Sequence, residues 1–194
     1  MEARTSTDSP IRVDYVPGDA LGLPEGSGTL GMTFAPGMKD RGWDRDVTTD
    51  LAALGDEYET DVLVSLMEDF EYDAYRMNGG RSFFDSAAAV GMEVVRFPIV
   101  DVDVPRSEQI EDFADLMGGI IGYLREGRNV VAHCRGGIGR TGTVVSSVLV
   151  GLGHEADDAI EIVRQARSPR MVETGPQEAY VREFAKKYRG KWSA

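Results

Sequence analysis

Residues 129–141 read Asn129-Val-Val-Ala-His-Cys-Arg-Gly-Gly-Ile-Gly-Arg-Thr141, and an almost uniformly apolar run follows to Leu152. The apolar residues up to His133 predict a buried strand, and Thr141 to Leu152 predicts a buried helix. The glycines of residues 136–139 form the connection. This stretch therefore predicts a strand, a glycine-rich loop and a helix in direct succession.

The sequence on both sides of this stretch alternates between extended and helical patterns. Two opening strands are expected at residues 11–16 and 28–34, paired as a hairpin or at a sheet edge. From residue 46 onward helices and strands alternate, which predicts an α/β fold with a central, mostly parallel (mixed) sheet flanked by helices. We expect a single domain over residues 11–190 and a flexible N-terminus over residues 1–10. Further strands are predicted at 61–66 and 93–98, and further helices at 46–58, 70–77, 82–90, 107–127 (with Ser107 as N-cap), 156–167 and 176–188.

The charge balance limits the classes of partner. The 194-residue chain has a net charge of -12, so nucleic acids and anionic membrane surfaces are disfavoured as main partners. The apolar run at 143–152 is too short to span a bilayer, and residues 1–10 contain no apolar signal segment. We therefore expect a cytoplasmic monomer that binds neither nucleic acid nor membranes.

The glycine-rich loop has the features of an anion site. Ligands of parallel sheets bind beyond the carboxyl ends of the strands, which is where Cys134 follows its strand. Glycines allow successive backbone N–H groups to turn toward one centre, and the N-terminus of the following helix adds partial positive charge. Arg140 can place a planar guanidinium against two phosphate oxygens. Together these features predict a site for a phosphate dianion.

Cys134 is the single cysteine of the chain, so it cannot form an intramolecular disulfide. A helix N-terminus and an arginine favour the thiolate over the thiol, and a thiolate beside bound phosphate is placed for in-line attack. This chemistry requires no metal and no cofactor. The hydroxyl of Thr141 or of a neighbouring residue could assist departure of the sulfur, and Thr141 could cap the helix, alone or in addition.

A second segment, Phe97-Pro-Ile-Val-Asp-Val-Asp-Val-Pro105, follows a predicted strand and supplies a proton donor for the leaving group. Asp101 and Asp103 are both candidates. Either carboxylate could instead be a solvated turn residue.

The segment His133-Cys-x5-Arg-Thr141 resembles the signature loop of the protein tyrosine phosphatase superfamily. The chain is also similar to small dual-specificity phosphatases, most closely to those of the kinase-associated phosphatase type. That similarity rests on Gly31-Met-Thr-Phe-Ala-Pro-Gly-Met-Lys39, on Phe97-Pro-Ile-Val-Asp101 and on the glycines before Arg140. It implies the cysteine-dependent phosphatase fold over the predicted domain.

The resemblance also implies roles for individual residues. Cys134 would be the nucleophile, Arg140 the phosphate clamp and Asp101 the general acid, with Asp103 as the alternative acid. His133 would tune the thiolate through hydrogen bonding, or it is a hydrogen-bonded histidine at a strand end. Gln177 is either a water-orienting residue or a polar residue early in a helix. The main chain that would bind phosphate belongs to Arg135, Gly136, Gly137, Ile138, Gly139 and Arg140.

The implied function is a cysteine-dependent protein phosphatase that acts on phosphotyrosine, with phosphoserine and phosphothreonine as additional candidate substrates. Only Arg135 adds a cation to the loop beyond Arg140, which favours a phosphoprotein over a phosphoinositide. Three alternatives remain: a phospho-binding module with weak turnover, a phosphatase of a non-protein phosphate ester, and a sulfur-transfer or arsenate-reducing enzyme. The last of these usually needs another cysteine or a differently spaced loop.

Overall fold

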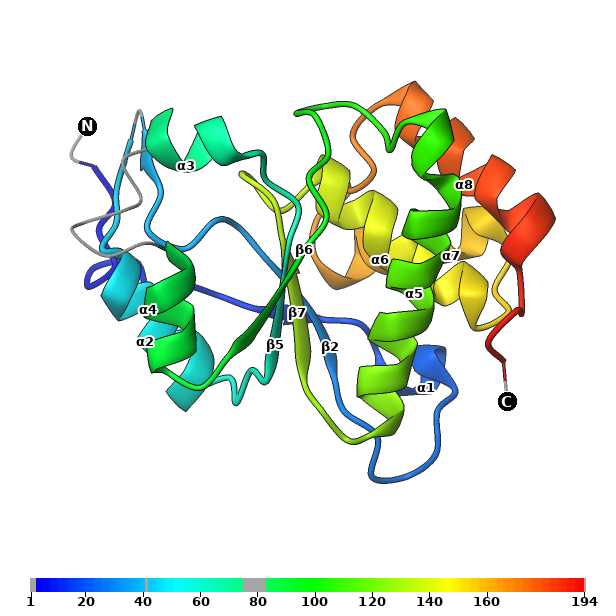
Figure 1. Ribbon diagram of the computed structural model, residues 1–194, viewed down its shortest axis with the longest axis horizontal. Helices are drawn as coiled ribbons and strands as arrows, with labels where there is room; N and C mark the ends of the chain where they lie inside the picture. The colour runs from blue at the N-terminus through cyan, green and yellow to red at the C-terminus, as the bar shows by residue number, and fades with distance from the viewer. Residues whose placement is uncertain (1–2, 41, 75–82, 194) are drawn as a thin grey trace.

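The computed structural model describes residues 3–40, 42–74 and 83–193 (Figure 1). Its centre is a five-stranded sheet in the order β1-β2-β7-β5-β6. Strand β1 is antiparallel to β2 and every other pair is parallel, so the predicted α/β fold with a mostly parallel sheet is confirmed. The strands are β1 (Asp14–Tyr15), β2 (Leu30–Thr33), β5 (Val62–Ser65), β6 (Glu93–Arg96) and β7 (Val130–His133).

Helices cover both faces of this sheet (Figure 1). Helices α2 and α4 lie on one side, and α5 and α6 lie on the other, with α7 and α8 packed on α6. The helices are α1 (Gly18–Leu21), α2 (Val47–Asp56), α3 (Asp69–Ala74), α4 (Phe83–Ala89), α5 (Ile110–Arg125), α6 (Gly139–Gly151), α7 (Ala156–Ala166) and α8 (Gly175–Tyr188). A two-stranded sheet of β3 (Lys39–Asp40) and β4 (Trp43–Asp44) and a 3-10 helix, η1 (Ser107–Gln109), complete the described elements.

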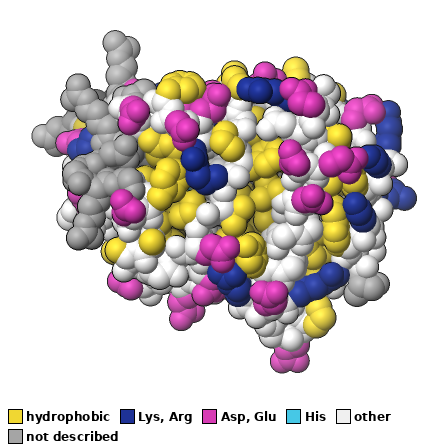
Figure 2. All heavy atoms as spheres, viewed as in Figure 1, with side chains coloured by type: hydrophobic (Ala, Val, Ile, Leu, Met, Phe, Trp, Pro, Cys, Tyr) yellow, Lys and Arg dark blue, Asp and Glu magenta, His cyan; other side chains and the backbone are white. Residues whose placement is uncertain are grey.

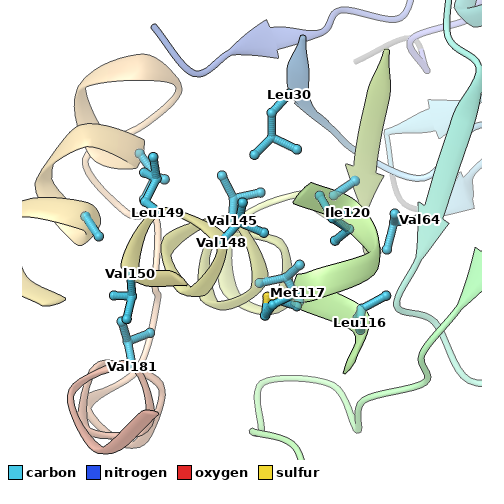
Figure 3. Close-up of a cluster of buried hydrophobic side chains, with 14 of the residues drawn as sticks. Leu30, Val64, Leu116, Met117, Ile120, Val145, Val148, Leu149, Val150 and Val181 are labelled. Atoms are coloured by element: carbon cyan, nitrogen blue, oxygen red, sulfur yellow. The ribbon is translucent and has the colours of Figure 1, made fainter. Parts of the chain in front are cut away.

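Helix α6 forms the centre of the larger hydrophobic core. Its side chains Val145 and Val148 pack in one cluster with Leu30 of β2 and Met117 of α5 (Figure 3). Every residue of α6 is buried. The loop that precedes α6 is therefore attached to an element that is packed on all sides.

Strand β7 holds the central position of the sheet. His133 pairs in register with Thr33 of β2 and with Ser65 of β5, so the carboxyl ends of three parallel strands meet at the same edge. All four residues of β7 are buried, and its first three are apolar, because both faces of the strand are covered. The chain leaves this edge at Cys134.

Several predicted boundaries were wrong. Helix α6 begins at Gly139 rather than at Thr141, because the glycine-rich residues already adopt helical geometry there. Ser107 is not the N-cap of α5, since it lies in η1 and Gln109 precedes α5. The opening pair of strands is confirmed as an antiparallel edge pair, although β1 has only two residues. Residues 75–77 and 82 of the two predicted helices lie outside the described residues.

The segment before residue 11 makes hydrogen bonds with later parts of the chain. The backbone N–H of Arg4 donates to the carbonyl of Gly42, and Arg45 Nη1 donates to the carbonyl of Ser9 at 2.6 Å. The extent of the domain, residues 11–190, stays a prediction. Among the described helices, none has the length together with the apolar composition that crossing a membrane would require.

Candidate active site

Cys134 lies at the carboxyl edge of the sheet, directly after β7. Its side chain is only 3% exposed, and it lines a cleft of about 510 Å³. Arg140 and Asp101 line the same cleft. The structure thus brings together the three residues that the sequence singled out for chemistry.

The carbonyl groups of the loop point away from this cleft toward other partners. The carbonyl of Arg135 accepts from the N–H of Ala35, and the carbonyl of Gly137 accepts from Arg167 Nε at 2.8 Å. Within the part of the chain that the structure describes, no acceptor is found for the N–H groups of Gly136 and Ile138. These N–H groups are therefore available as donors, as the predicted nest requires, and phosphate binding by residues 135–140 stays a prediction.

Gly137 is the loop position that requires glycine. Its φ is +66°, a value that L side chains rarely adopt, and a Cβ added there would lie 2.1 Å from the carbonyl oxygen of Thr33. A Cβ added at Gly136 would meet nothing closer than Ile138 Cγ1 at 3.9 Å. The close approach of the loop to β2 therefore requires glycine at position 137 but not at position 136.

Arg140 is held in the first turn of α6 by a buried set of acceptors. Its Nη1 and Nη2 donate to Glu71 Oε2 and Oε1 at 2.7 and 2.9 Å, and Nη1 also donates to the carbonyl of Ile99 at 3.0 Å. Burial opposes the charge of the guanidinium. Its hydrogen bonds to Glu71 and the electrostatic effect of nearby Cys134, Glu71 and Asp101 outweigh burial, so the pKa of Arg140 is raised. Arg140 Nε is buried and has no partner among the described residues.

Glu71 was not identified from the sequence. It lies in α3, is 2% exposed and accepts both prongs of the Arg140 guanidinium. The only signal was an acidic residue shortly after β5, and Glu68 and Asp69 share that signal. Sequence alone could not separate the three.

The two aspartates of the loop after β6 differ in their hydrogen-bond donors and in their position relative to the cleft. Asp101 Oδ1 accepts from Arg140 Nη2 at 2.8 Å, whereas Asp103 Oδ1 accepts from the N–H of Val104 and does not line the cleft. A turn closed by the N–H of Asp103 and the carbonyl of Val100 separates them. Val102 within this turn has φ +57°, a strained value for a β-branched residue.

Gln177 anchors the same loop from α8. Its Nε2 donates to the carbonyl of Asp103 at 3.1 Å, and its backbone N–H donates to Thr174 Oγ1, which caps the helix. A Cβ added at Gly139 would come within 2.9 Å of the Gln177 side chain. Gln177 is therefore an early-helix polar residue that also lies against the start of α6; a water-orienting role stays a prediction.

His133 is completely buried beside the nucleophile candidate. Burial lowers its pKa to about 4, with Arg140 acting in the same direction, so the ring is neutral at pH 7. The ring nitrogen Nδ1 lies 3.3 Å from the carbonyl of Cys134, which can only accept, so Nδ1 carries the hydrogen. Nε2 has no partner among the described residues.

Thr141 does not cap α6, because the helix begins two residues earlier at Gly139. Its hydroxyl is buried and without a partner among the described residues. The capping alternative for Thr141 was wrong. Assistance to the departing sulfur stays a prediction.

The outer wall of the cleft comes from segments that the sequence analysis did not assign to the site. Met38 and Trp43 belong to the β3–β4 region, and Arg170 and Glu173 belong to the loop between α7 and α8. Arg135 of the loop is paired with Asp40 of β3. No group of three His, Cys, Asp or Glu side chains in residues 3–40, 42–74 and 83–193 could hold a metal ion.

Residues 36–154, more than half of the chain, match the model of the family Tc-R-P, described as a polymorphic toxin system DSP-PTPase phosphatase. The chain belongs to this family. The predicted membership of the dual-specificity branch of the tyrosine phosphatase superfamily is confirmed.

Individual relatives agree with this assignment. Cyclin-dependent kinase inhibitor 3 of Rattus norvegicus is 26% identical over 96% of this chain and 84% of its own length. An uncharacterized protein of Methanocaldococcus jannaschii, MJECL20, is 39% identical over 46% of this chain. Protein tyrosine phosphatase type IVA 3 of Mus musculus is 31% identical over 51% of this chain. The chain spans 58% of MJECL20 and 56% of the mouse protein.

Two solved structures show the same fold. A crystal structure of kinase-associated phosphatase, in which the catalytic-site cysteine is replaced by serine, has a TM-score of 0.83 and 23% identity. The match covers 93% of this chain and 97% of the kinase-associated phosphatase chain. Tk-PTP in its active form has a TM-score of 0.66 and 26% identity. The match covers 90% of this chain and 97% of the Tk-PTP chain. The cysteine-dependent phosphatase fold is thereby confirmed.

Proposed function

We propose that this chain is a cysteine-dependent protein phosphatase that hydrolyses phosphotyrosine through a cysteinyl-phosphate intermediate, with phosphoserine and phosphothreonine as further candidate substrates. The carrying observation is that Cys134, Arg140 and Asp101 line one cleft, with Asp101 Oδ1 2.8 Å from Arg140 Nη2. The catalytic-site cysteine of kinase-associated phosphatase supports the assignment of Cys134, the single cysteine of this chain.

The reaction has two displacements at phosphorus. The Cys134 thiolate attacks phosphorus, the bond to the substrate oxygen breaks, and protonated Asp101 gives its proton to that oxygen. A water molecule then attacks phosphorus, its proton passes to the Asp101 carboxylate, and the P–S bond breaks to regenerate the thiolate. Arg140 and the N–H groups of residues 135–140 stabilise the charge on the equatorial oxygens in both steps.

The cleft wall supports a protein substrate with an aromatic phosphate ester. Apolar side chains of Met38, Trp43 and Ile138 line the cleft with Cys134 and suit the ring of phosphotyrosine. Arg135 is paired with Asp40, which reduces the positive charge available to a ligand with several phosphates. These contacts favour a phosphoprotein over a phosphoinositide.

We also propose a cytoplasmic monomer that binds neither nucleic acid nor membranes. The net charge of -12 supports the part of this proposal that concerns nucleic acids and anionic membranes. On the face seen in Figure 2, Lys and Arg side chains lie in small groups among Asp and Glu side chains rather than in one extended basic surface.

A phosphopeptide panel tests the proposed reaction. Wild type should release phosphate from phosphotyrosine peptides in the presence of EDTA, and Cys134→Ser should release none while still binding the peptide. Mass spectrometry of acid-quenched wild type should find phosphate on the peptide that contains Cys134. A fully folded wild type that hydrolyses no phosphate ester, or phosphate found on another residue, would refute the proposal.

The same panel decides the substrate. Faster release from phosphotyrosine than from phosphoserine and phosphothreonine peptides of the same sequence is expected. Faster release from a soluble phosphoinositide than from every peptide would contradict the assignment to phosphoproteins. Thiosulfate and arsenate, assayed beside para-nitrophenyl phosphate, should give no turnover.

A further inference from the structure

Arg167 lies behind the glycine-rich loop, on the side away from the cleft. It is the C-cap residue of α7, its side chain is 9% exposed, and it is not among the residues that line the cleft. Nε donates to the carbonyl of Gly137 at 2.8 Å, and Nη2 lies 3.5 Å from the carbonyl of Gly136. One guanidinium therefore contacts two consecutive carbonyl groups of the loop.

The same guanidinium is fixed to the sheet. Nη1 donates to the carbonyl of Met32 in β2 at 3.1 Å and lies 2.7 Å from Asp14 Oδ2 in β1. Asp14 Oδ1 in turn pairs with Arg12, which is exposed. Arg167 thus connects two strands, the end of α7 and the loop through its three guanidinium nitrogens.

These contacts determine the direction of the loop N–H groups. Within a trans peptide unit the C=O and the following N–H point in opposite directions. Holding the carbonyls of Gly136 and Gly137 toward Arg167 therefore turns the N–H groups of Gly137 and Ile138 away from Arg167. Neither N–H group has an acceptor among the described residues.

The contribution of Arg167 is one of orientation more than of net charge. Its guanidinium is buried against the Asp14 carboxylate, so the two charges offset each other. Burial lowers the pKa of Arg167, and Asp14 and Cys134 oppose that shift. Other loop carbonyls have local partners, since Ile138 accepts from Gly142 and Gly139 accepts from Thr143.

We infer that Arg167 is a positioning residue that orients the Gly137 and Ile138 N–H groups for phosphate, with Asp14 fixing its guanidinium. This inference rests on the proposed function, because it assigns a ligand to those N–H groups. A purely structural ion pair between β1 and α7 would instead stabilise the fold without affecting phosphate affinity.

The test is the inhibition constant of inorganic phosphate in Arg167→Lys, with para-nitrophenyl phosphate as substrate. Lysine keeps the charge but cannot contact both carbonyls and Asp14 together. We expect the inhibition constant to rise about tenfold or more and kcat to fall by a similar factor. An inhibition constant is independent of the fraction of folded enzyme, so loss of stability alone cannot produce this rise.

Arg164→Lys is the matched control. Arg164 also lies in α7 and bonds a carbonyl, that of Met171, and a carboxylate, that of Glu178, but it does not contact the loop. It should keep the wild-type inhibition constant. Equal inhibition constants in wild type and Arg167→Lys, or an equal rise in Arg164→Lys, would overturn the inference.

Two further measurements keep the test decisive. If Arg167→Lys does not fold, Asp14→Asn, which retains an acceptor oxygen, should raise the inhibition constant about threefold, and an unchanged constant would overturn the inference. If wild type lacks turnover, calorimetry still measures the affinity for inorganic phosphate. It compares Cys134→Ser with the double variant that also carries Arg167→Lys. Weaker binding in the double variant supports the role of Arg167 even where the proposed reaction fails.

Discussion

Arg140 and Glu71 form a buried two-pronged ion pair, with Nη1 2.7 Å from Oε2 and Nη2 2.9 Å from Oε1. The pair leaves Nε as the guanidinium donor without a partner among the described residues. Glu71 therefore fixes the orientation of the Arg140 guanidinium. Glu71 lies in α3, a helix for which the sequence predicted no role in the site.

Removal of the Glu71 carboxylate should destabilise the protein strongly. Glu71→Ala leaves the buried charge of Arg140 without its main partner, so the free energy of unfolding should fall by about 3–5 kcal/mol. Asp69→Ala is the control, since this carboxylate lies in the same helix, is 83% exposed and pairs with Arg96. Its loss should cost less than about 1 kcal/mol. Urea unfolding gives both values, and equal losses would contradict the prediction.

Asp101 and Asp103 should differ in their effect on turnover. Asp101→Asn should lower kcat by about 10²–10⁴ with phenyl phosphate, whose leaving group needs a proton, and by much less with para-nitrophenyl phosphate. Asp103→Asn should leave kcat close to that of wild type, because its carboxylate bonds only the adjacent N–H of Val104 within the described structure. A larger loss in Asp103→Asn would assign the acid to that residue instead.

Alanine should be tolerated at one loop glycine and not at its neighbour. In Gly137→Ala the added Cβ would collide with the carbonyl of Thr33 at 2.1 Å, and φ would remain at a strained +66°. We expect phosphate binding to be lost and the melting temperature to fall. Gly136→Ala, with only Ile138 Cγ1 near its added Cβ, should keep the wild-type melting temperature. Calorimetry of both variants checks the contrast, which fails if their melting temperatures are equal.

His133 should make stability depend on acidity. The pKa of His133 falls from 6.5 to about 4 on folding. Between these pH values His133 is protonated in the unfolded chain and neutral in the folded protein. Stability is therefore lost as the pH falls from about 6.5 to 4, by roughly 3 kcal/mol in total. His133→Gln should lack this component when urea midpoints are compared at pH 7 and pH 4.5.

The second histidine provides the control for that experiment. His154→Gln removes the other imidazole of the chain, whose Nε2 lies 2.6 Å from the carbonyl of Ala20. Loss of the pH dependence in this variant would assign it to the second imidazole instead of His133. The same pH dependence in His133→Gln as in wild type would show that His133 does not cause it.

Local sequence patterns predicted the elements of the site. They did not predict which side chains far apart in the sequence form ion pairs or hydrogen bonds. Strand β7, the glycine-rich loop and α6 were recognisable because hydrophobic runs and glycines are local signals. Glu71 and Arg167 were missed, since their partners lie 69 and 30 residues away and many other charged residues are equivalent in the sequence. The start of α6 was misplaced because glycine weakens any helical pattern.

The acid loop shows the same limit on a smaller scale. Asp101 and Asp103 are both carboxylates beside valines, and the turn that separates them depends on a strained φ at Val102. The bond from Gln177 to the carbonyl of Asp103 also fixes this turn from a distant helix. Neither feature has a sequence signature, so both candidates had to remain open until the geometry was known.

The complete burial of α6 limits how this protein can change during evolution. Because every residue of α6 is buried, a substitution along this helix alters both the hydrophobic core and the element that follows the glycine-rich loop. At the cleft rim, Trp43 packs on Phe34 with ring centroids 5.0 Å apart, whereas Arg170 is exposed in the loop between α7 and α8. We therefore expect the exposed cleft rim at Arg170 to tolerate substitution better than the buried positions of α6.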